Sequence, residues 1–298
     1  MNNHAKLSSP ALGAILYMAL AMVIWAAIET IALLFTKHYS SFQVVWMRYS
    51  VHLLFMLIVL GPRARARLFR TQRLGMQFLR GMLMMGMHLS FIFAVRHMPV
   101  SATMAGFWVT PLLLLGFSAL RGERPDWLHW LITAAVTAGV WVILRPVSAV
   151  MQPAGLLAIS MALCFVIYMQ MTRAMKGEDL LASLFYTAFS VWIVLSAFMP
   201  FYWVTPTFPD LLVAAAIGLL GYVGILGFDR AAELAPTWVS APIGFLQPVM
   251  MLFSDWIFRH HFAGRFSLGV AGLIVAALGL LAWRSLPVLR SKLGYHHV

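Results

Sequence analysis

The chain has 298 residues, of which 62% are hydrophobic and only 10% are charged, and its formal net charge at pH 7 is +12. A soluble globular protein is about half apolar and about a quarter charged, so this composition excludes a soluble fold of this length. The basic residues lie in short segments between apolar runs, a pattern that favours membrane topology over nucleic-acid binding. We therefore predict an all-α integral membrane protein within a lipid bilayer.

Apolar runs of about 20 residues recur along the chain, and a helix of that length crosses a bilayer. The runs are continuous and lack the alternation of a transmembrane β-strand. The first run is too long for the apolar core of a signal peptide, and we expect it to remain as a membrane helix. In chain order the sequence predicts ten transmembrane helices, at residues 12–35, 42–61, 74–96, 99–120, 127–144, 153–174, 180–200, 210–230, 237–258 and 265–285.

Lysine and arginine residues between these helices predict the orientation in the membrane. If the N-terminus is cytoplasmic, most of them fall on the cytoplasmic side, including every arginine between residues 63 and 73. Cytoplasmic segments of membrane proteins carry such an excess. Both termini are therefore expected in the cytoplasm.

Motifs from the first half of the chain return in the second half. Residues 19–25 (A-L-A-M-V-I-W) align with residues 162–168 (A-L-C-F-V-I-Y), and Pro99 and Pro111 align at one constant offset with Pro236 and Pro248. We predict two repeats of five helices, at residues 1–148 and 149–298. Because five is odd, the second repeat enters the membrane from the other side, and an inverted 5+5 repeat is a device of secondary transporters.

The ends of the two halves carry the most specific sequence features. They are A-V-R-H-M-P-V-S-A-T-M at residues 94–104, G-E-R-P at 122–125 and A-A-E-L-A-P-T-W-V-S-A-P at 231–242. With these features the chain resembles the ten-helix, EamA-type permeases of the drug/metabolite transporter superfamily. It departs from many members at residues 259–261, where Arg-His-His stands in place of a second Gly-Glu-Arg turn.

The resemblance implies a secondary carrier in the bacterial inner membrane that works by alternating access. Export of a small amphipathic metabolite, an amino acid or an amino-acid derivative, is the function we expect from it. Export of an opine-type metallophore and import of a nucleoside-like metabolite are the alternatives within the same fold. Proton exchange and the substrate gradient alone both fit as energy sources, and the sequence indicates no particular oligomeric state.

Ionisable residues inside membrane helices are costly and mark the first candidates for substrate binding. Glu29 lies one helical turn after Trp25, so the two share a face. Glu29 either binds a substrate amine or a proton, or pairs with a basic residue such as Arg48 or His52. Arg48 either binds a substrate carboxylate or extends to the surface. Further along, His88 near mid-span is a candidate for titration near neutral pH, whereas Arg80 is expected to extend to the cytoplasm.

The duplicated prolines mark a second group of candidates. Pro111 and Pro248 predict bends, because proline frees a backbone carbonyl within a membrane helix, and bent helices can serve as gates. Trp108 and Gln247, close to these prolines, are expected to line the substrate site. Tyr168, the partner of Trp25 across the repeat, is expected to form the opposite aromatic wall, and Tyr222 is a further candidate. The glycines at 218, 221, 224 and 227 predict close packing of their helix.

No enzyme motif is present in the sequence. A phosphate-binding Gly-x-x-x-x-Gly-Lys-Ser/Thr loop and a His-Glu-x-x-His motif are both missing. The single cysteine, Cys164, lies within an apolar run and cannot form a disulfide or a zinc site alone. We therefore expect a transporter without catalytic residues, cofactor or metal site, whose partners are a small-molecule substrate and the bilayer.

Overall fold

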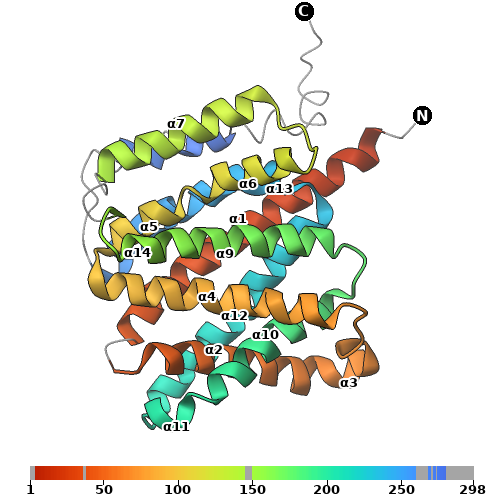
Figure 1. Ribbon diagram of the computed structural model, residues 1–298, viewed down its shortest axis with the longest axis vertical. Helices are drawn as coiled ribbons and strands as arrows, with labels where there is room; N and C mark the ends of the chain where they lie inside the picture. The colour runs from red at the N-terminus through yellow and green to blue at the C-terminus, as the bar shows by residue number, and fades with distance from the viewer. Residues whose placement is uncertain are drawn as a thin grey trace, which may run out of the picture.

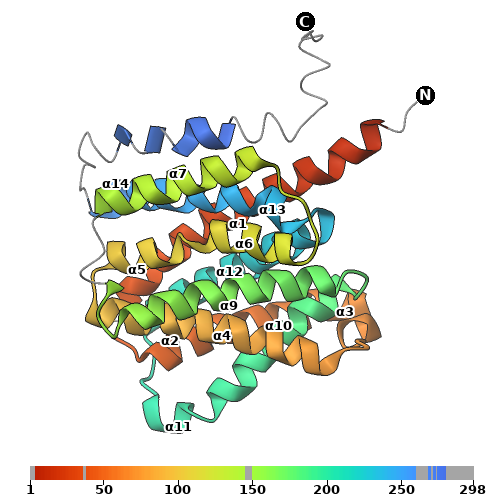
Figure 2. The same cartoon turned by 45° about the horizontal axis from the view of Figure 1, so that its top comes forward.

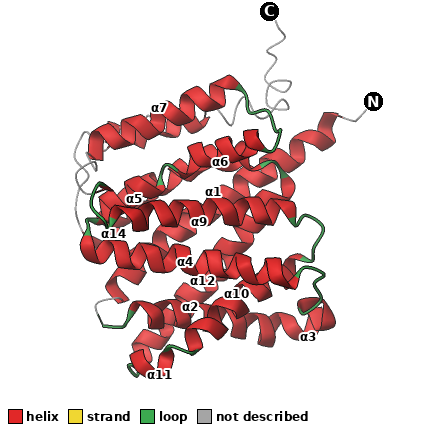
Figure 3. Cartoon of the chain, in the orientation of Figure 1, coloured by secondary structure: helices red, strands yellow, loops and turns green. Residues whose placement is uncertain are grey.

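The computed structural model describes residues 4–35, 38–144, 150–259, 268–269, 271–272 and 274–279. Apart from one isolated bridge between Lys176 and Glu178, the secondary structure of these residues is helical. Figure 3 shows the helices joined by short loops. The long helices are α1 (His4–Phe35), α2 (Ser41–Phe55), α4 (Leu74–His97), α7 (Trp127–Leu144), α9 (Gly155–Ala174), α10 (Leu180–Ser196) and α12 (Phe208–Leu234).

The described residues contain six helical stretches long and apolar enough to cross a membrane. They are Pro10–Ala32, Ser41–Leu68, Leu74–His97, Val100–Leu120, Gly155–Ala174 and Phe208–Leu234, and two shorter apolar helices span Trp127–Val142 and Leu180–Ser196. These helices confirm the prediction of an all-helical membrane protein. The count of ten stays a prediction, and most of the tenth predicted helix, 265–285, lies outside the described residues.

The contacts of α1 and α4 organise the bundle. Helix α1 runs along α12, and α4 packs against both α9 and α10 (Figure 1). Helices α7 and α14 (Leu246–Arg259) lie on one side of the bundle, and α11 (Met199–Tyr202) lies on the other (Figure 2). The contact between α1 and α12 depends on small residues, because a Cβ atom at Gly227 would lie 2.8 Å from the carbonyl oxygen of Tyr17. This agrees with the close packing expected from the glycines of α12.

Both of the proline-containing segments are interrupted helices. The first consists of α5 (Val100–Phe107) and α6 (Thr110–Leu120), which are separated at residues 108–109. The second consists of α13 (Thr237–Ser240), the 3-10 turn η3 (Ala241–Phe245) and α14. Pro111 and Pro248 follow these breaks, because proline cannot donate the hydrogen bond that would continue the helix across the break. The structure therefore shows helix interruptions next to both prolines, and bends at these positions and their use as gates stay predictions.

The entrances to these two interrupted helices have the same backbone geometry. Met98 (φ −144°, ψ 157°) and Ala235 (φ −143°, ψ 162°) are both extended, and each donates its N–H to the carbonyl oxygen four residues earlier. A residue before proline is pushed out of the helical region, and Pro99 and Pro236 then begin α5 and α13 with nearly equal angles. The match supports the predicted repeat, although the relation between whole halves stays a prediction.

The arginine-rich segment, residues 61–73, lies at one end of the bundle. We call this end of the bundle the arginine-rich end. The segment continues from α2 through η1 (Met56–Leu60), α3 (Gly61–Ala64) and η2 (Arg65–Leu68). It is tied to the α9–α10 turn, where Arg67 pairs with Asp179 at 2.9 Å and Thr71 donates to Glu178 at 2.8 Å. The side chain of Leu68 is fully buried beneath it.

We expect the Arg67–Asp179 pair to contribute little to stability. The Arg67 side chain is 70% exposed, and exposed ion pairs contribute less than about 1 kcal/mol because water screens them. Arg67→Ala should therefore leave the free energy of unfolding in detergent within about 1 kcal/mol of the parent value. Leu68→Ala, in the same turn, should cost about 2–5 kcal/mol because it removes a buried side chain. Equal losses for the two variants would contradict this assignment.

At the other end of the bundle, the α1–α2 loop and the start of α2 contact the start of α12 and the segment before it. Tyr39 donates to the carboxylate of Asp210, which raises the pKa of the Tyr39 phenol and keeps it protonated as a donor. Gln43 exchanges two hydrogen bonds with the backbone of Val204. Contacts between chain-distant loops thus tie both ends of the bundle.

Candidate functional site

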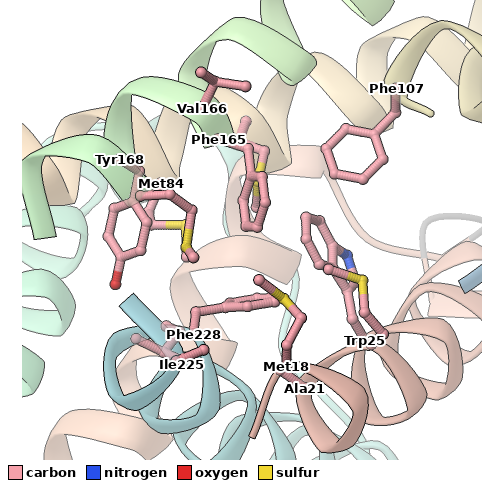
Figure 4. Close-up of a cluster of buried hydrophobic side chains, with 14 of the residues drawn as sticks. Met18, Ala21, Trp25, Met84, Phe107, Phe165, Val166, Tyr168, Ile225 and Phe228 are labelled. Atoms are coloured by element: carbon pink, nitrogen blue, oxygen red, sulfur yellow. The ribbon is translucent and has the colours of Figure 1, made fainter. Parts of the chain in front are cut away.

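Four aromatic rings meet in the centre of the bundle. They belong to Trp25 of α1, Phe107 of α5, Phe165 of α9 and Phe228 of α12. The Trp25 ring lies 5.1 Å from Phe107 and 5.3 Å from both Phe165 and Phe228, measured between ring centroids. Figure 4 shows these rings with Met18 and Met84 beside them. We call these four residues the aromatic cluster; tilted and edge-on packing of this kind is favourable for aromatic side chains.

Glu29 lies one turn beyond this cluster and is linked to two predicted site residues by a chain of hydrogen bonds. Gln247 Nε2 donates to Glu29 Oε2 at 2.9 Å, and the Trp108 indole donates to Gln247 Oε1 at 3.1 Å. All three side chains are buried. The indole is only a donor, so this chain of hydrogen bonds fixes the orientation of the Gln247 amide. The structure thus brings together Glu29, Trp108 and Gln247 from three separate helical segments.

The expected alternative pairing of Glu29 with Arg48 or His52 is not formed. Within the described residues the ion pairs closer than 4.0 Å are Arg67–Asp179, Arg80–Asp229 and Arg230–Glu233. Glu29 instead accepts its hydrogen bond from a neutral amide. Its carboxylate is therefore held in place without a cation in contact.

Arg48 and His88 form a second buried pair. Arg48 Nη1 lies within hydrogen-bond distance of His88 Nε2, and His88 Nδ1 lies 2.7 Å from the carbonyl oxygen of Met84. Because a guanidinium can only donate, Nε2 must accept, and the His88 proton belongs on Nδ1, where it bonds to Met84. The geometry therefore describes a neutral His88 that supports Arg48. Arg48 does not extend to the surface, since the residue is only 9% exposed.

A third polar centre corrects the expectation for Arg80. Its guanidinium does not extend to the cytoplasm but pairs with Asp229 of α12 at 2.9 Å, and both side chains are at most 2% exposed. Thr172 and Thr187 accept further hydrogen bonds from it at 3.1 and 2.9 Å. Hydrogen bonds to a buried carboxylate and to hydroxyl acceptors stabilise the Arg80 guanidinium more than hydration at the membrane surface would. Sequence reasoning missed Asp229, although an aspartate within a predicted span was a usable signal.

Tyr168 belongs to this third centre and not to a wall facing Trp25. Its phenol donates to Asp229 Oδ1, and the guanidinium carbon of Arg80 lies 4.8 Å from its ring centroid. Figure 4 shows its hydroxyl directed away from Trp25. The wall that faces Trp25 is formed by Phe107, Phe165 and Phe228, three residues that the sequence interpretation did not select.

Tyr222 and Pro111 occupy different surroundings. Tyr222 packs against His52 and Phe55 of α2, with centroid distances of 5.2 and 5.0 Å. Its recorded ring contacts are thus with α2 and not with the aromatic cluster. Pro111 packs on the other interrupted helix, because a Cβ atom at Gly244 would lie 3.3 Å from its ring. A small apolar pocket lies at this crossing, lined by Met18, Met22, Phe107, Trp108, Thr110, Pro111, Leu114, Phe165, Ala241 and Gly244.

No metal-binding cluster is present in the described part of the chain, because three or more His, Cys, Asp or Glu side chains nowhere converge there. The chemistry that the centre offers is binding. It combines an aromatic surface with a carboxylate and a guanidinium, which recognise apolar rings, cations and anions respectively.

Comparison with known proteins identifies the family. Residues 12–145 match the EamA-like transporter family. This match covers the first predicted repeat and confirms the resemblance to EamA-type transporters of the drug/metabolite transporter superfamily, which are transporters and not enzymes.

Curated relatives extend the comparison over nearly the whole chain. The S-adenosylmethionine uptake transporter of Rickettsia bellii (strain RML369-C) is 22% identical over 298 residues, which cover 98% of this chain and 100% of the relative. The transporter of the same name from Rickettsia prowazekii (strain Madrid E) is 23% identical over 257 residues, which cover 85% and 86%. A solved structure titled "Crystal structure of protein" has the same fold, with a TM-score of 0.73 and 18% identity over 91% of this chain and 98% of its own.

These relatives overturn the expected function. The sequence interpretation favoured export of an amino acid or an amino-acid derivative, whereas the relatives are named uptake transporters for S-adenosylmethionine. Their names agree better with the alternative of import, although the cargo they name is not the nucleoside-like metabolite of that alternative. The helices of an alternating-access transporter do not indicate the direction of transport. For this reason the resemblance to the family led to the wrong expected direction.

Proposed function

We propose that this EamA-family transporter carries S-adenosylmethionine, or a close chemical relative, into the cell. The observation that carries the proposal is a buried aromatic cluster flanked by two separate charges of opposite sign, Glu29 and Arg48. S-adenosylmethionine combines an adenine ring, a sulfonium cation and an amino-acid end with an ammonium and a carboxylate. Each part has a matching partner in the site, and the named relatives support this choice of cargo.

The aromatic cluster suits the adenine and the sulfonium. Rings at right angles or tilted to one another offer both faces and edges to a planar base. The negative face of an indole also attracts a cation, and desolvation strengthens this attraction. Trp25, which contacts three other rings, is central to this part of the proposal.

The binding residues that we propose are Trp25, Glu29, Arg48, Trp108 and Gln247. Glu29 binds the substrate cation, while Gln247 and Trp108 hold the Glu29 carboxylate in position through their hydrogen bonds. His88 supports Arg48. Tyr168 and Tyr222 are left out of the first contact shell, because the contacts described for them lead to Asp229 and to α2.

Transport would follow from alternating access in an inverted repeat. The contacts at the two ends of the bundle would open alternately. The helix interruptions before Pro111 and Pro248 would act as hinges next to the site. The predicted topology, with both termini in the cytoplasm of a bacterial inner membrane, places the arginine-rich end inside.

Uptake into proteoliposomes tests this function. Purified protein should give saturable entry of radiolabelled S-adenosylmethionine above protein-free vesicles, and unlabelled S-adenosylmethionine should compete. Methionine and adenosine should compete more weakly, because each fills only part of the site. Saturable entry of adenosine with none of S-adenosylmethionine would instead support a nucleoside importer and refute the proposal.

A further inference from the structure

The fold contains two buried arginines with very different surroundings. Arg80 has a carboxylate at 2.9 Å, two threonine hydroxyls and the Tyr168 hydroxyl as acceptors. Arg48 is also buried, yet none of the ion pairs of the described residues includes it. Its Nε is buried without a hydrogen-bond partner there, and its recorded bond goes to the neutral His88. The two arginines therefore differ in whether a contacting carboxylate matches their charge.

The polar groups around Arg48 do not supply a contacting counter-charge. Tyr49 and His52 come from its own helix, and His88 comes from α4. Glu29 is the carboxylate that acts on it through space, but it lies outside ion-pair distance. A charge buried in this way is costly unless another group compensates it. A ligand of opposite charge is such a group.

The site is shaped to hold this guanidinium. A Cβ atom at Gly221 of α12 would lie 2.7 Å from Arg48 Nε and 3.4 Å from Nη2. Only glycine therefore leaves the guanidinium its space against α12. On the other side His88, fixed by Met84, accepts from Nη1. Arg48 is thus positioned by two elements that carry no charge.

Glu29 and Arg48 follow one pattern. Each is buried, and each is held by a neutral partner, Gln247 in one case and His88 in the other. Oppositely charged side chains held apart in this way match the ammonium and carboxylate of a zwitterionic α-amino acid. We propose that Arg48, positioned by His88 and Gly221, binds the carboxylate of the substrate, so that the transporter selects cargo with an amino-acid end. This inference rests on the proposed uptake function.

Decarboxylated S-adenosylmethionine tests the inference, because it differs from S-adenosylmethionine only by lacking the carboxylate. Both compounds are used to inhibit uptake of radiolabelled S-adenosylmethionine into proteoliposomes. Loss of a charged hydrogen bond weakens binding by about tenfold or more. For the parent protein, the decarboxylated compound should therefore inhibit at least about tenfold more weakly. In Arg48→Gln, affinity for S-adenosylmethionine should fall to that of the decarboxylated compound, and discrimination should vanish.

Two further variants separate recognition from folding. Gly221→Ala keeps the charge of Arg48 but displaces its guanidinium. It should therefore weaken the binding of S-adenosylmethionine more than the binding of the decarboxylated compound. Arg63→Gln, at an exposed position, should leave both affinities unchanged. Equal affinity of the parent for the two compounds, or equal weakening of both in Arg48→Gln, would overturn the carboxylate assignment alone. Failure of the parent to take up or bind either compound would refute the proposed function and the inference with it.

Discussion

Replacing Asp229 with asparagine should lower the free energy of unfolding by about 3–5 kcal/mol, because it leaves the buried Arg80 without a charged partner. The pair joins α4 to α12, and Thr172 and Thr187 add contacts from α9 and α10. One substitution therefore weakens the junction of four helices. Thermal or denaturant unfolding of the detergent-solubilised protein measures the effect.

A matched variant on the same helix controls for the loss of a carboxylate. Glu233 pairs with Arg230 at 2.8 Å, but the two side chains are 35% and 40% exposed. Glu233→Gln should therefore change the stability by less than about 1 kcal/mol. The double variant Arg80→Met/Asp229→Leu should recover most of the lost stability, because apolar groups can replace a buried ion pair. An Asp229→Asn variant as stable as the parent would show that the pair is not a structural tie.

Glu29→Gln should reduce the initial rate of S-adenosylmethionine uptake at low substrate concentration by about tenfold or more. The substitution keeps the size of the side chain and a carbonyl acceptor for Gln247, but it removes the charge that we assign to the substrate cation. Loss of a hydrogen bond to a charged group costs about 1.5–3 kcal/mol, which corresponds to at least about tenfold in affinity.

Stability separates this effect from misfolding. Glu29→Gln removes a buried charge and retains a hydrogen-bonding partner for Gln247, so the unfolding transition should move little. Glu233→Gln serves again as the control for uptake. Undiminished uptake in Glu29→Gln would remove Glu29 from the substrate site and leave it as a packing residue.

Several features of this protein follow from the sequence alone, because their physical causes are local. Apolar runs of bilayer length form helices, since every backbone group must find its partner within the segment. Pro99 and Pro236 begin new helices because the preceding residues cannot stay helical. The burial of Glu29 also follows from its place within a membrane-length run.

Partners of the buried polar residues were decided only by the tertiary structure. Arg80 and Asp229 are 149 residues apart, and Glu29 and Gln247 are 218 apart. Which side chains meet depends on the rotation and crossing of packed helices, and a shift of one position turns a side chain by about 100° around its helix. For this reason Tyr168 contacts an unpredicted ion pair, whereas Arg48 lies beside His88 with its charge unmatched. Local sequence determined which charged residues lie within the membrane-length helices, and helix packing determined which of them pair with one another.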